Sequence, residues 1–184
     1  FSHPMNYAKI QPKHTLKEST RQIFQICLGS LLDSVKIEGG FFMEFQTLIE
    51  NRRSVRKYSS HTNVTKEQIQ QLVQAALEAP SWKNTETGRY YCVLSEDMSQ
   101  KLRKECLCYA NNDVKTEHAA LIVTTFVHNR AGFQTDGTPD NEIGNGWGCY
   151  DLGLQNENLI LKATELGLST LIMGLRDGDK IREM

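Results

Sequence analysis

A cluster of cations around residue 52 is the first feature of this sequence that could do chemistry. Arg52, Arg53, Ser54 and Arg56 lie within five positions, directly after a short amphipathic pattern. Guanidinium and hydroxyl groups at this spacing can hold a phosphate through charge-assisted hydrogen bonds. Taken alone, the segment is more typical of a solvated basic turn. Nucleic-acid binding is a weaker alternative, because no series of stacking aromatic residues accompanies the cations.

A second candidate is the loop that follows a helical pattern at Pro80. Ser81 and Asn84 offer small hydroxyl and amide groups beside the large aromatic ring of Trp82. Such a loop can hydrogen-bond the carbonyl and ring-nitrogen edge of a heterocycle while the indole packs on a flat group. An ordinary helix-terminating loop with a half-buried tryptophan is the alternative, and the segment alone favours it.

The apolar run over residues 167–174 is a third candidate, because it ends in Met173 and Gly174. A strand that ends in glycine lets its backbone approach a ligand closely, since no side chain stands in the way. A core strand that ends in a turn is again the commoner outcome for this pattern taken alone.

Hydrolytic and metal chemistry find little support in the sequence. Ser54 and Ser81 lack the G-x-S-x-G context of a nucleophile elbow. The histidines show neither i,i+4 pairing nor an HExxH frame, and His118 and His128 are expected to be structural or surface residues. Glycines at positions 144, 146 and 148 resemble a phosphate loop only superficially, because no strand precedes them. We therefore predict no catalytic side chain and no metal ligand.

Length and composition indicate one globular domain. The chain has 184 residues, of which 39% are hydrophobic, and this is enough to build a core. The formal net charge of −1 gives no global field that would recruit nucleic acid or an acidic membrane surface. Five scattered cysteines without a CxxC pair indicate reduced thiols in a cytoplasmic protein. No apolar run approaches the ~20 residues of a membrane span.

Helical and strand patterns mix without a regular βαβ period, so the expected fold class is α+β. A capping box at Thr65 and Gln68 starts a helix that Pro80 stops, and Gly167 ends another helix. Residues 129–146 carry no periodicity and are expected to form a long surface loop, of the kind that acts as a lid or binding loop. The expected helices cover residues 45–52, 65–79, 98–109 and 151–166, with a last one capped by Asp177, and the expected strands cover residues 90–94, 119–127 and 169–173.

Residues 1–42 differ from the rest and are expected to be a leader of uncertain structure, followed by a single domain over residues 43–184. Apolar residues recur at roughly helical spacing between Leu16 and Val35, which predicts an amphipathic helix. A disordered leader and non-native upstream sequence are the alternatives, and we favour these two together. The stretch lacks the basic start, apolar centre and cleavage site of a secretory signal.

Three segments of the sequence follow one another in a recognisable series. They are Ile49–Arg56, Ala79–Asn84 and Asp151–Leu159, the last of which leads into residues 167–174. In this order and spacing they resemble the nitroreductase-like family of FMN-dependent oxidoreductases. The resemblance covers the chain from about Met43 onward. No single segment is decisive, but their order makes the match specific.

The resemblance implies an α+β fold with a central, mostly antiparallel sheet flanked by helices, assembled as an intertwined homodimer with two FMN sites at the interface. Four residues match the segment that holds the FMN phosphate and the pyrimidine edge of the flavin: Arg52, Arg53, Ser54 and Arg56. Four others match the loop that reaches the flavin from the neighbouring subunit: Pro80, Ser81, Trp82 and Asn84. Met173 and Gly174 match the strand end beside the isoalloxazine ring.

The implied activity is that of an FMN-dependent NAD(P)H oxidoreductase that reduces nitroaromatic, quinone or similar flat acceptors by ping-pong hydride transfer through flavin. Most of this chemistry belongs to the cofactor, so no acid–base residue is required. A dehalogenation or flavin-fragmentation reaction on the same scaffold is one alternative. A flavin-binding or interaction module without turnover is another. The resemblance adds no nucleic-acid or membrane partner.

Two departures from the family pattern bear on these expectations. Glu86 lies where many members have glutamine, and a carboxylate there would disfavour an adjacent reduced flavin unless it faces water, as we expect. The family normally continues beyond the helix at Met184 to another strand and a basic tail. The start at Phe1, upstream of a Met-Glu-Phe sequence at Met43, also suggests a fragment or an artificial leader.

Overall fold

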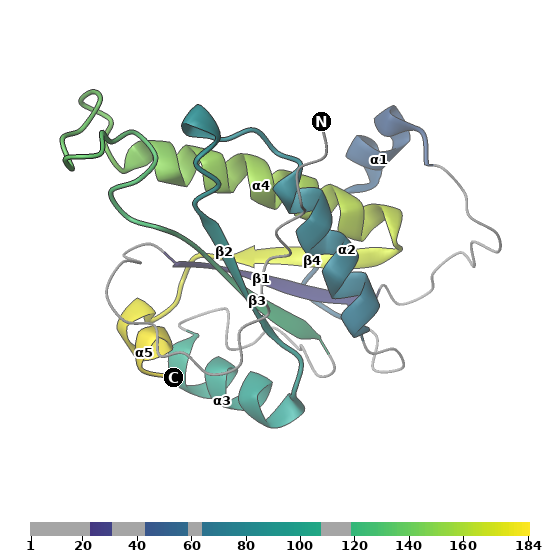
Figure 1. Cartoon of the computed structure of the whole chain (residues 1–184). Coiled ribbons are helices and arrows are strands. Elements are labelled where there is room, and N and C mark those ends of the chain that lie inside the picture. Colours follow the sequence, from purple (N-terminus) through teal and green to yellow (C-terminus); the bar gives the residue numbers. More distant parts are fainter. Residues whose placement is uncertain (1–22, 31–42, 59–63, 108–118) are drawn as a thin grey trace.

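The computed structural model describes residues 23–30, 43–58, 64–107 and 119–184. Within these residues, strands form one antiparallel sheet in the order β2-β3-β1-β4, with helices on both of its faces (Figure 1). The strands are β1 (Ile23–Ser30), β2 (Gly88–Val93), β3 (Ala120–Phe126) and β4 (Leu168–Met173). The helices are α1 (Phe45–Asn51), α2 (Lys66–Leu77), the short 3₁₀ helix η1 (Trp82–Asn84), α3 (Glu96–Cys106), α4 (Gly146–Glu165) and α5 (Gly178–Glu183). The predicted α+β class and mostly antiparallel sheet are confirmed.

Strand β1 corrects the prediction made for the first 42 residues. The amphipathic helix and the favoured disordered leader are both wrong over Ile23–Ser30, which form a strand in the middle of the sheet. Ile26 pairs with Ile122 on one side and with Ile172 on the other. A strand covered on both faces reads as a continuous apolar run, and in a single sequence such a run is easily taken for one side of a helix. The rest of the expected leader lies outside the described residues, so for them it stays a prediction.

One face of the sheet is covered by α2 and α4, which lie above it in Figure 1. The predicted capping box starts α2, because Thr65 and Gln68 exchange side-chain and backbone hydrogen bonds of 3.2 and 2.9 Å. The apolar side of this helix then packs on the sheet together with α4. The core on this face is formed by Ile26, Leu28, Ile69, Leu72, Ala76, Ala120, Ile122, Leu159, Ile160, Ala163 and Leu168.

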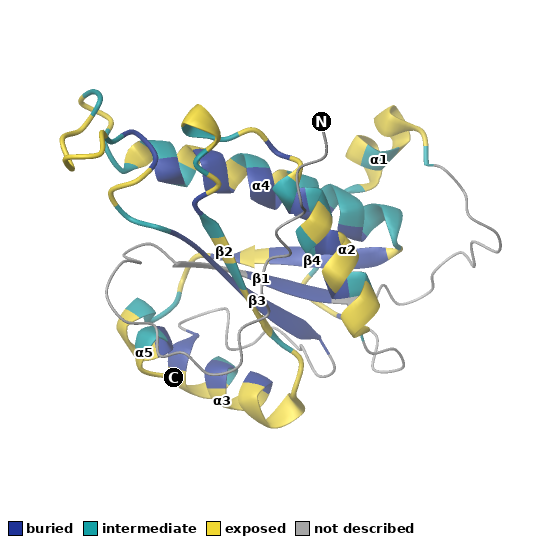
Figure 2. Ribbon diagram, viewed as in Figure 1, coloured by how far each residue is buried: buried dark blue, intermediate teal, exposed yellow. Residues whose placement is uncertain are grey.

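The other face is covered by α3 and α5 (Figure 1). Asp177 caps α5 as predicted, since its carboxylate accepts the backbone N–H groups of Asp179 and Lys180. The core on this face is formed by Cys27, Tyr58, Leu102, Cys106, Leu107, Ala119, Leu121, Val123, Leu171, Met173 and Ile181. Because both faces are covered, β3 is buried along its whole length, as its uninterrupted apolar sequence predicted (Figure 2).

Helix α4 begins five residues earlier than predicted. Its first turn holds Gly146 and Gly148, and a Cβ atom on Gly148 would lie 2.3 Å from the ring of Phe126. The glycine series is thus a helix start that packs closely on β3, which accounts for these small residues without a phosphate loop. The helix ends at Glu165, and Gly167, with a φ of +71°, gives the left-handed cap expected there.

Residues 129–146 form the predicted long loop. Its backbone is a series of turns with one bridge, between Phe133 and Pro139. None of the helices in the described ranges is long and apolar enough to span a bilayer.

Candidate functional site

The arginine segment runs along the outer edge of β4. Helix α1 ends at Arg52, whose backbone turns to the extended conformation with φ −60° and ψ 122°. Ser54 then forms a parallel bridge with Thr170, and the N–H of Val55 donates to the carbonyl of Thr170 at 3.0 Å. The segment therefore meets β4 through one isolated bridge, and at that point it runs in the same direction as the strand.

The side chains of this segment face solvent. Arg53, Ser54 and Arg56 are exposed, and Arg52 is half-buried. The Arg53 guanidinium donates to the carbonyl of Arg52 at 2.7 Å and keeps further N–H groups for a ligand. Burial raises the pKa of Tyr58, and the charge of the nearby Arg56 opposes that shift. The cations thus lie at one edge of the sheet, where they lose little hydration when the chain folds.

β4 lies beside this segment, which bridges it at Thr170. Because Ser54 pairs with Thr170 in parallel, both chains run in the same direction toward Gly174. Gly174 is exposed, and a Cβ atom on it would meet nothing within 4 Å. The Met173 side chain is buried in the core that faces α3 and α5, so only its backbone can face a ligand. The first predicted group is thus a neighbour of the strand that carries the third, with Ser54 level with Thr170, four residues before Gly174.

The second predicted group, the loop at residues 80–86, adopts a tight conformation after α2. The Ser81 hydroxyl accepts the N–H of Glu86 at 3.0 Å, and its carbonyl accepts the N–H of Asn84 at 3.0 Å. The Asn84 amide donates to the Glu86 carboxylate at 3.3 Å. Pro80, Asn84 and Glu86 are exposed. The expectation that Glu86 faces water is confirmed.

Trp82 fixes this loop to α4 and to the 129–146 loop. Its backbone N–H donates to Asp151 at 2.9 Å, and its indole N–H donates to Asp140 at 3.2 Å. The flat group on which its ring packs is Trp147, with ring centroids 4.2 Å apart. Burial raises the pKa of Asp151, and the Trp82 N–H opposes that shift.

Sequence reasoning missed these three partners of Trp82. Asp140, Trp147 and Asp151 lie far from Trp82 in the sequence, and local periodicity cannot indicate a contact of that range. One available signal was Asp151 itself, a carboxylate that precedes Leu152 at the start of an apolar helical stripe and is buried in the structure.

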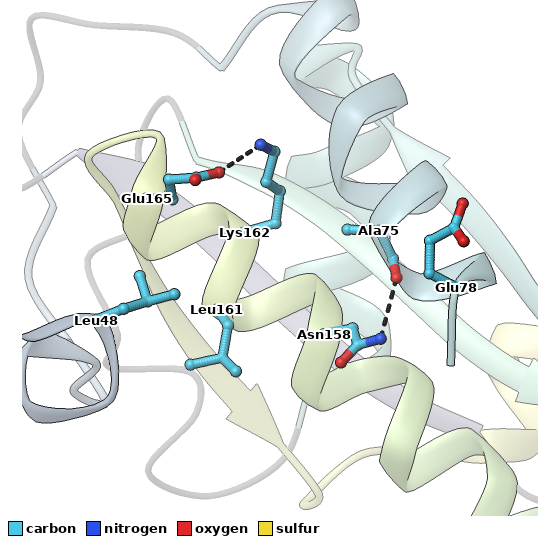
Figure 3. A pocket seen from close by; sticks show the side chains of 7 residues that line it. All are labelled: Leu48, Ala75, Glu78, Asn158, Leu161, Lys162 and Glu165. Carbon is cyan, nitrogen blue, oxygen red and sulfur yellow. Dashed lines mark hydrogen bonds and ion pairs between the residues drawn. The ribbon is translucent and has the colours of Figure 1, made fainter. Parts of the chain in front are cut away.

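An open groove of about 270 Å³ lies between α1, α2 and α4 (Figure 3). Asn158 in this groove donates to the carbonyl of Ala75 at 3.2 Å, and Lys162 pairs with Glu165. The groove is lined by Leu48, Ala75, Glu78, Asn158, Leu161, Lys162 and Glu165. It contains none of the predicted site residues, and its one lysine is already paired, so it is not the phosphate site. Among the described residues, no group of three or more His, Cys, Asp or Glu side chains could hold a metal ion.

Comparison with known proteins identifies the family. The Nitroreductase family profile matches residues 49–184, which is well over half of the chain and includes all three predicted groups. The chain belongs to the nitroreductase family. A comparison with curated proteins found no match.

Solved nitroreductase-family structures share the fold of this chain. A nitroreductase family protein from Clostridium difficile 630 is 24% identical with a TM-score of 0.59, covering 77% of this chain and 74% of that one. One from Clostridium novyi NT is 21% identical with a TM-score of 0.60, covering 77% and 76%. An FMN complex from Exiguobacterium sibiricum 255-15 is 24% identical with a TM-score of 0.59, covering 77% and 80%. The nitroreductase fold predicted from the three segments is thereby confirmed.

Proposed function

We propose that this chain is an FMN-dependent oxidoreductase that takes electrons from NAD(P)H and passes them to nitroaromatic, quinone or similar flat acceptors in a ping-pong cycle. The observation that carries the proposal is the parallel bridge between Ser54 and Thr170, which lays the arginine segment along β4, the strand that runs on to Gly174, in a nitroreductase-family chain. The FMN complex among the related folds supports FMN as the cofactor.

The arginine segment would hold the FMN phosphate. The guanidinium groups of Arg53 and Arg56 and the Ser54 hydroxyl are exposed, and Arg52 anchors the segment to the end of α1. Charge-assisted hydrogen bonds from such donors suit a phosphate dianion, and they also suit the pyrimidine edge of a flavin. The exposed backbone at Gly174 leaves room for a planar ring, and Met173 contributes to that wall through its main chain.

The loop with Pro80, Ser81, Trp82 and Asn84 would complete the site from a second copy of the chain. Within one chain this loop is bonded to α4 and the 129–146 loop through Asp151 and Asp140. The arginine segment is bonded instead to β4. A homodimer in which each subunit supplies one half of each site unites the two groups, and we propose self-association for this reason.

Bound flavin would supply the electron transfer between NAD(P)H and the acceptor. The residues of the chain would bind and orient it, and nearby guanidinium charge would stabilise negative charge on the reduced ring. No protonating side chain is needed. The acceptor is a small molecule, and no nucleic-acid, membrane or metal component enters the proposal. A cytoplasmic location is part of the proposal, since the scattered cysteines of the sequence form no CxxC pair.

The double variant Arg53→Ala, Ser54→Ala tests the phosphate assignment. We expect FMN affinity to fall roughly ten- to hundredfold in a fluorescence titration, because charge-assisted hydrogen bonds are lost. Lys101→Ala removes an exposed cation from α3, outside all the predicted site segments, and should leave FMN affinity unchanged. Equal FMN affinity in the double variant and the parent chain would remove the arginine segment from the site. NADH and NADPH consumption with a panel of nitroaromatics and quinones then tests turnover.

A further inference from the structure

The loop that follows α2 holds a strained backbone. Lys83, Asn84 and Glu86 have positive φ angles of 46°, 54° and 46°. Residues other than glycine rarely adopt this left-handed region, and they stay there only where the surroundings fix them. Strain of this kind is typical of ligand clamps, whose geometry is set before the ligand arrives. Contacts from outside the loop should therefore hold it in place.

Asp140 supplies contacts of this kind. One carboxylate oxygen accepts the indole N–H of Trp82 at 3.2 Å, and Lys83 donates to both oxygens at 2.9 and 3.1 Å. The Asp140 side chain is 15% exposed, whereas that of Lys83 is 61% exposed. An ion pair with so exposed a lysine contributes little by itself, so the less exposed bond to Trp82 is the stronger restraint.

Asp140 is itself held in place by the 129–146 loop. Its backbone N–H donates to the carbonyl of Gly132 at 2.8 Å. A Cβ atom on Gly132 would lie 2.5 Å from the ring of Trp147, so this glycine allows the loop to pack directly against that indole. Trp147 in turn packs against Trp82, with the two ring planes tilted by 38°. The two loops thus form one packed unit, and the Asp140 carboxylate lies at their junction.

We propose that Asp140 is a positioning residue that holds the Trp82–Glu86 loop in its cofactor-binding conformation and so couples the 129–146 loop to FMN affinity. The inference rests on the proposed function, because that function gives this loop its ligand. Asp140 does not touch the cofactor in this scheme. It acts through Trp82 and Lys83, whose positions decide whether Ser81 and Asn84 can meet the flavin edge.

Asp140→Ala and Asp140→Asn test the proposal, with Asp136→Ala as the matched control. Asp136 is an exposed carboxylate of the same loop that bonds only locally, accepting the N–H of Thr138 at 2.9 Å. Two readouts follow loop order without FMN, namely the coupled far-UV circular dichroism of the stacked indoles and the rate of tryptic cleavage after Lys83. A third readout is FMN affinity by fluorescence titration of the full chain.

Asp140→Ala should lose the indole signal, be cleaved sooner after Lys83 and bind FMN about tenfold more weakly, whereas Asp136→Ala should match the parent chain. Asp140→Asn should lie between them, since its amide oxygen can still accept the Trp82 indole N–H. Parent-like loop order or parent-like FMN affinity in Asp140→Ala overturns the proposal, as does an equal loss in Asp136→Ala.

Failure of the proposed function gives a different pattern. A parent chain that binds no FMN refutes that function, and loop order then decides the role of Asp140 alone. Faster cleavage after Lys83 in Asp140→Ala, but not in Asp136→Ala, still supports the role of Asp140 in holding the Trp82–Glu86 loop. Equal cleavage in both variants overturns it.

Discussion

The substitution Ile26→Ala tests the central position of β1. Ile26 is fully buried between β3 and β4, in the core that α2 and α4 cover. Truncating a buried isoleucine to alanine costs roughly 2–5 kcal/mol, from lost apolar burial and from the cavity that remains. A domain of this size loses about 2–4 °C in melting temperature for each kcal/mol, so we expect a drop of roughly 4–20 °C.

Ile172→Ala is the matched control for this experiment. Ile172 is the cross-strand partner of Ile26 on β4, but it is 48% exposed. The same change of side chain should therefore cost only roughly 1 kcal/mol. Thermal unfolding followed by far-UV circular dichroism, with urea midpoints as a second measure, compares the two variants. Equal melting temperatures in the two variants would show that β1 is not a core strand. A chain that starts at Met43 and keeps the melting temperature of the parent would refute the central position of β1 outright.

Three further predictions concern packing, charge and thiol protection. Gly148→Ala should lower the free energy of unfolding by about 1–3 kcal/mol, because its Cβ would meet the Phe126 ring, whereas Gly153→Ala in the same helix meets nothing and should raise it by roughly 0.5–1 kcal/mol. Urea unfolding measures both, and equal effects would contradict the packing at Phe126. Because the pKa of Asp151 is raised on folding, its contribution to the free energy of unfolding is fully favourable below the ordinary pKa of 3.8. That contribution is lost as pH rises through the raised pKa. Asp151→Asn should therefore gain melting temperature relative to the parent chain between pH 4 and pH 7, and a constant difference would contradict this. Burial raises the pKa of Cys27 to about 12, so its labelling by a thiol reagent at pH 8 should follow global unfolding, and rapid labelling of the native chain would contradict its core position.

Elements with local signals were predictable from the sequence. The capping box at Thr65, the apolar run of β3 and the glycine cap at Gly167 each depend on a few neighbouring residues. The pattern of α1 predicted a helix correctly, but it did not indicate what covers the apolar side. Phe45 is 65% exposed, and Ile49 is also exposed. Periodicity reports which residues share a face, and only the tertiary structure shows whether that face is covered.

Strand β1 and the surroundings of Trp82 were not predictable in this way. Ile26 pairs with Ile122 and Ile172, which are remote in the sequence, and its own run fits a buried strand and a helix alike. The packing of the Trp82 indole on a bound flat group stays a prediction, and within the chain its ring packs against Trp147. The role of the arginine segment stays a prediction from its residue types, and its pairing with β4 depends on backbone geometry that composition does not reveal.

The most direct test of the proposed function is an absorption spectrum of the purified chain, recorded after FMN is added and the excess is removed by gel filtration. We predict retained flavin with shifted absorption bands and quenched fluorescence, since the arginine segment runs along β4, the strand that ends at the exposed backbone of Gly174. Loss of that retained flavin in the Arg53→Ala, Ser54→Ala variant would assign it to this segment. A parent chain that leaves the column without flavin, while folded by circular dichroism, would contradict the account.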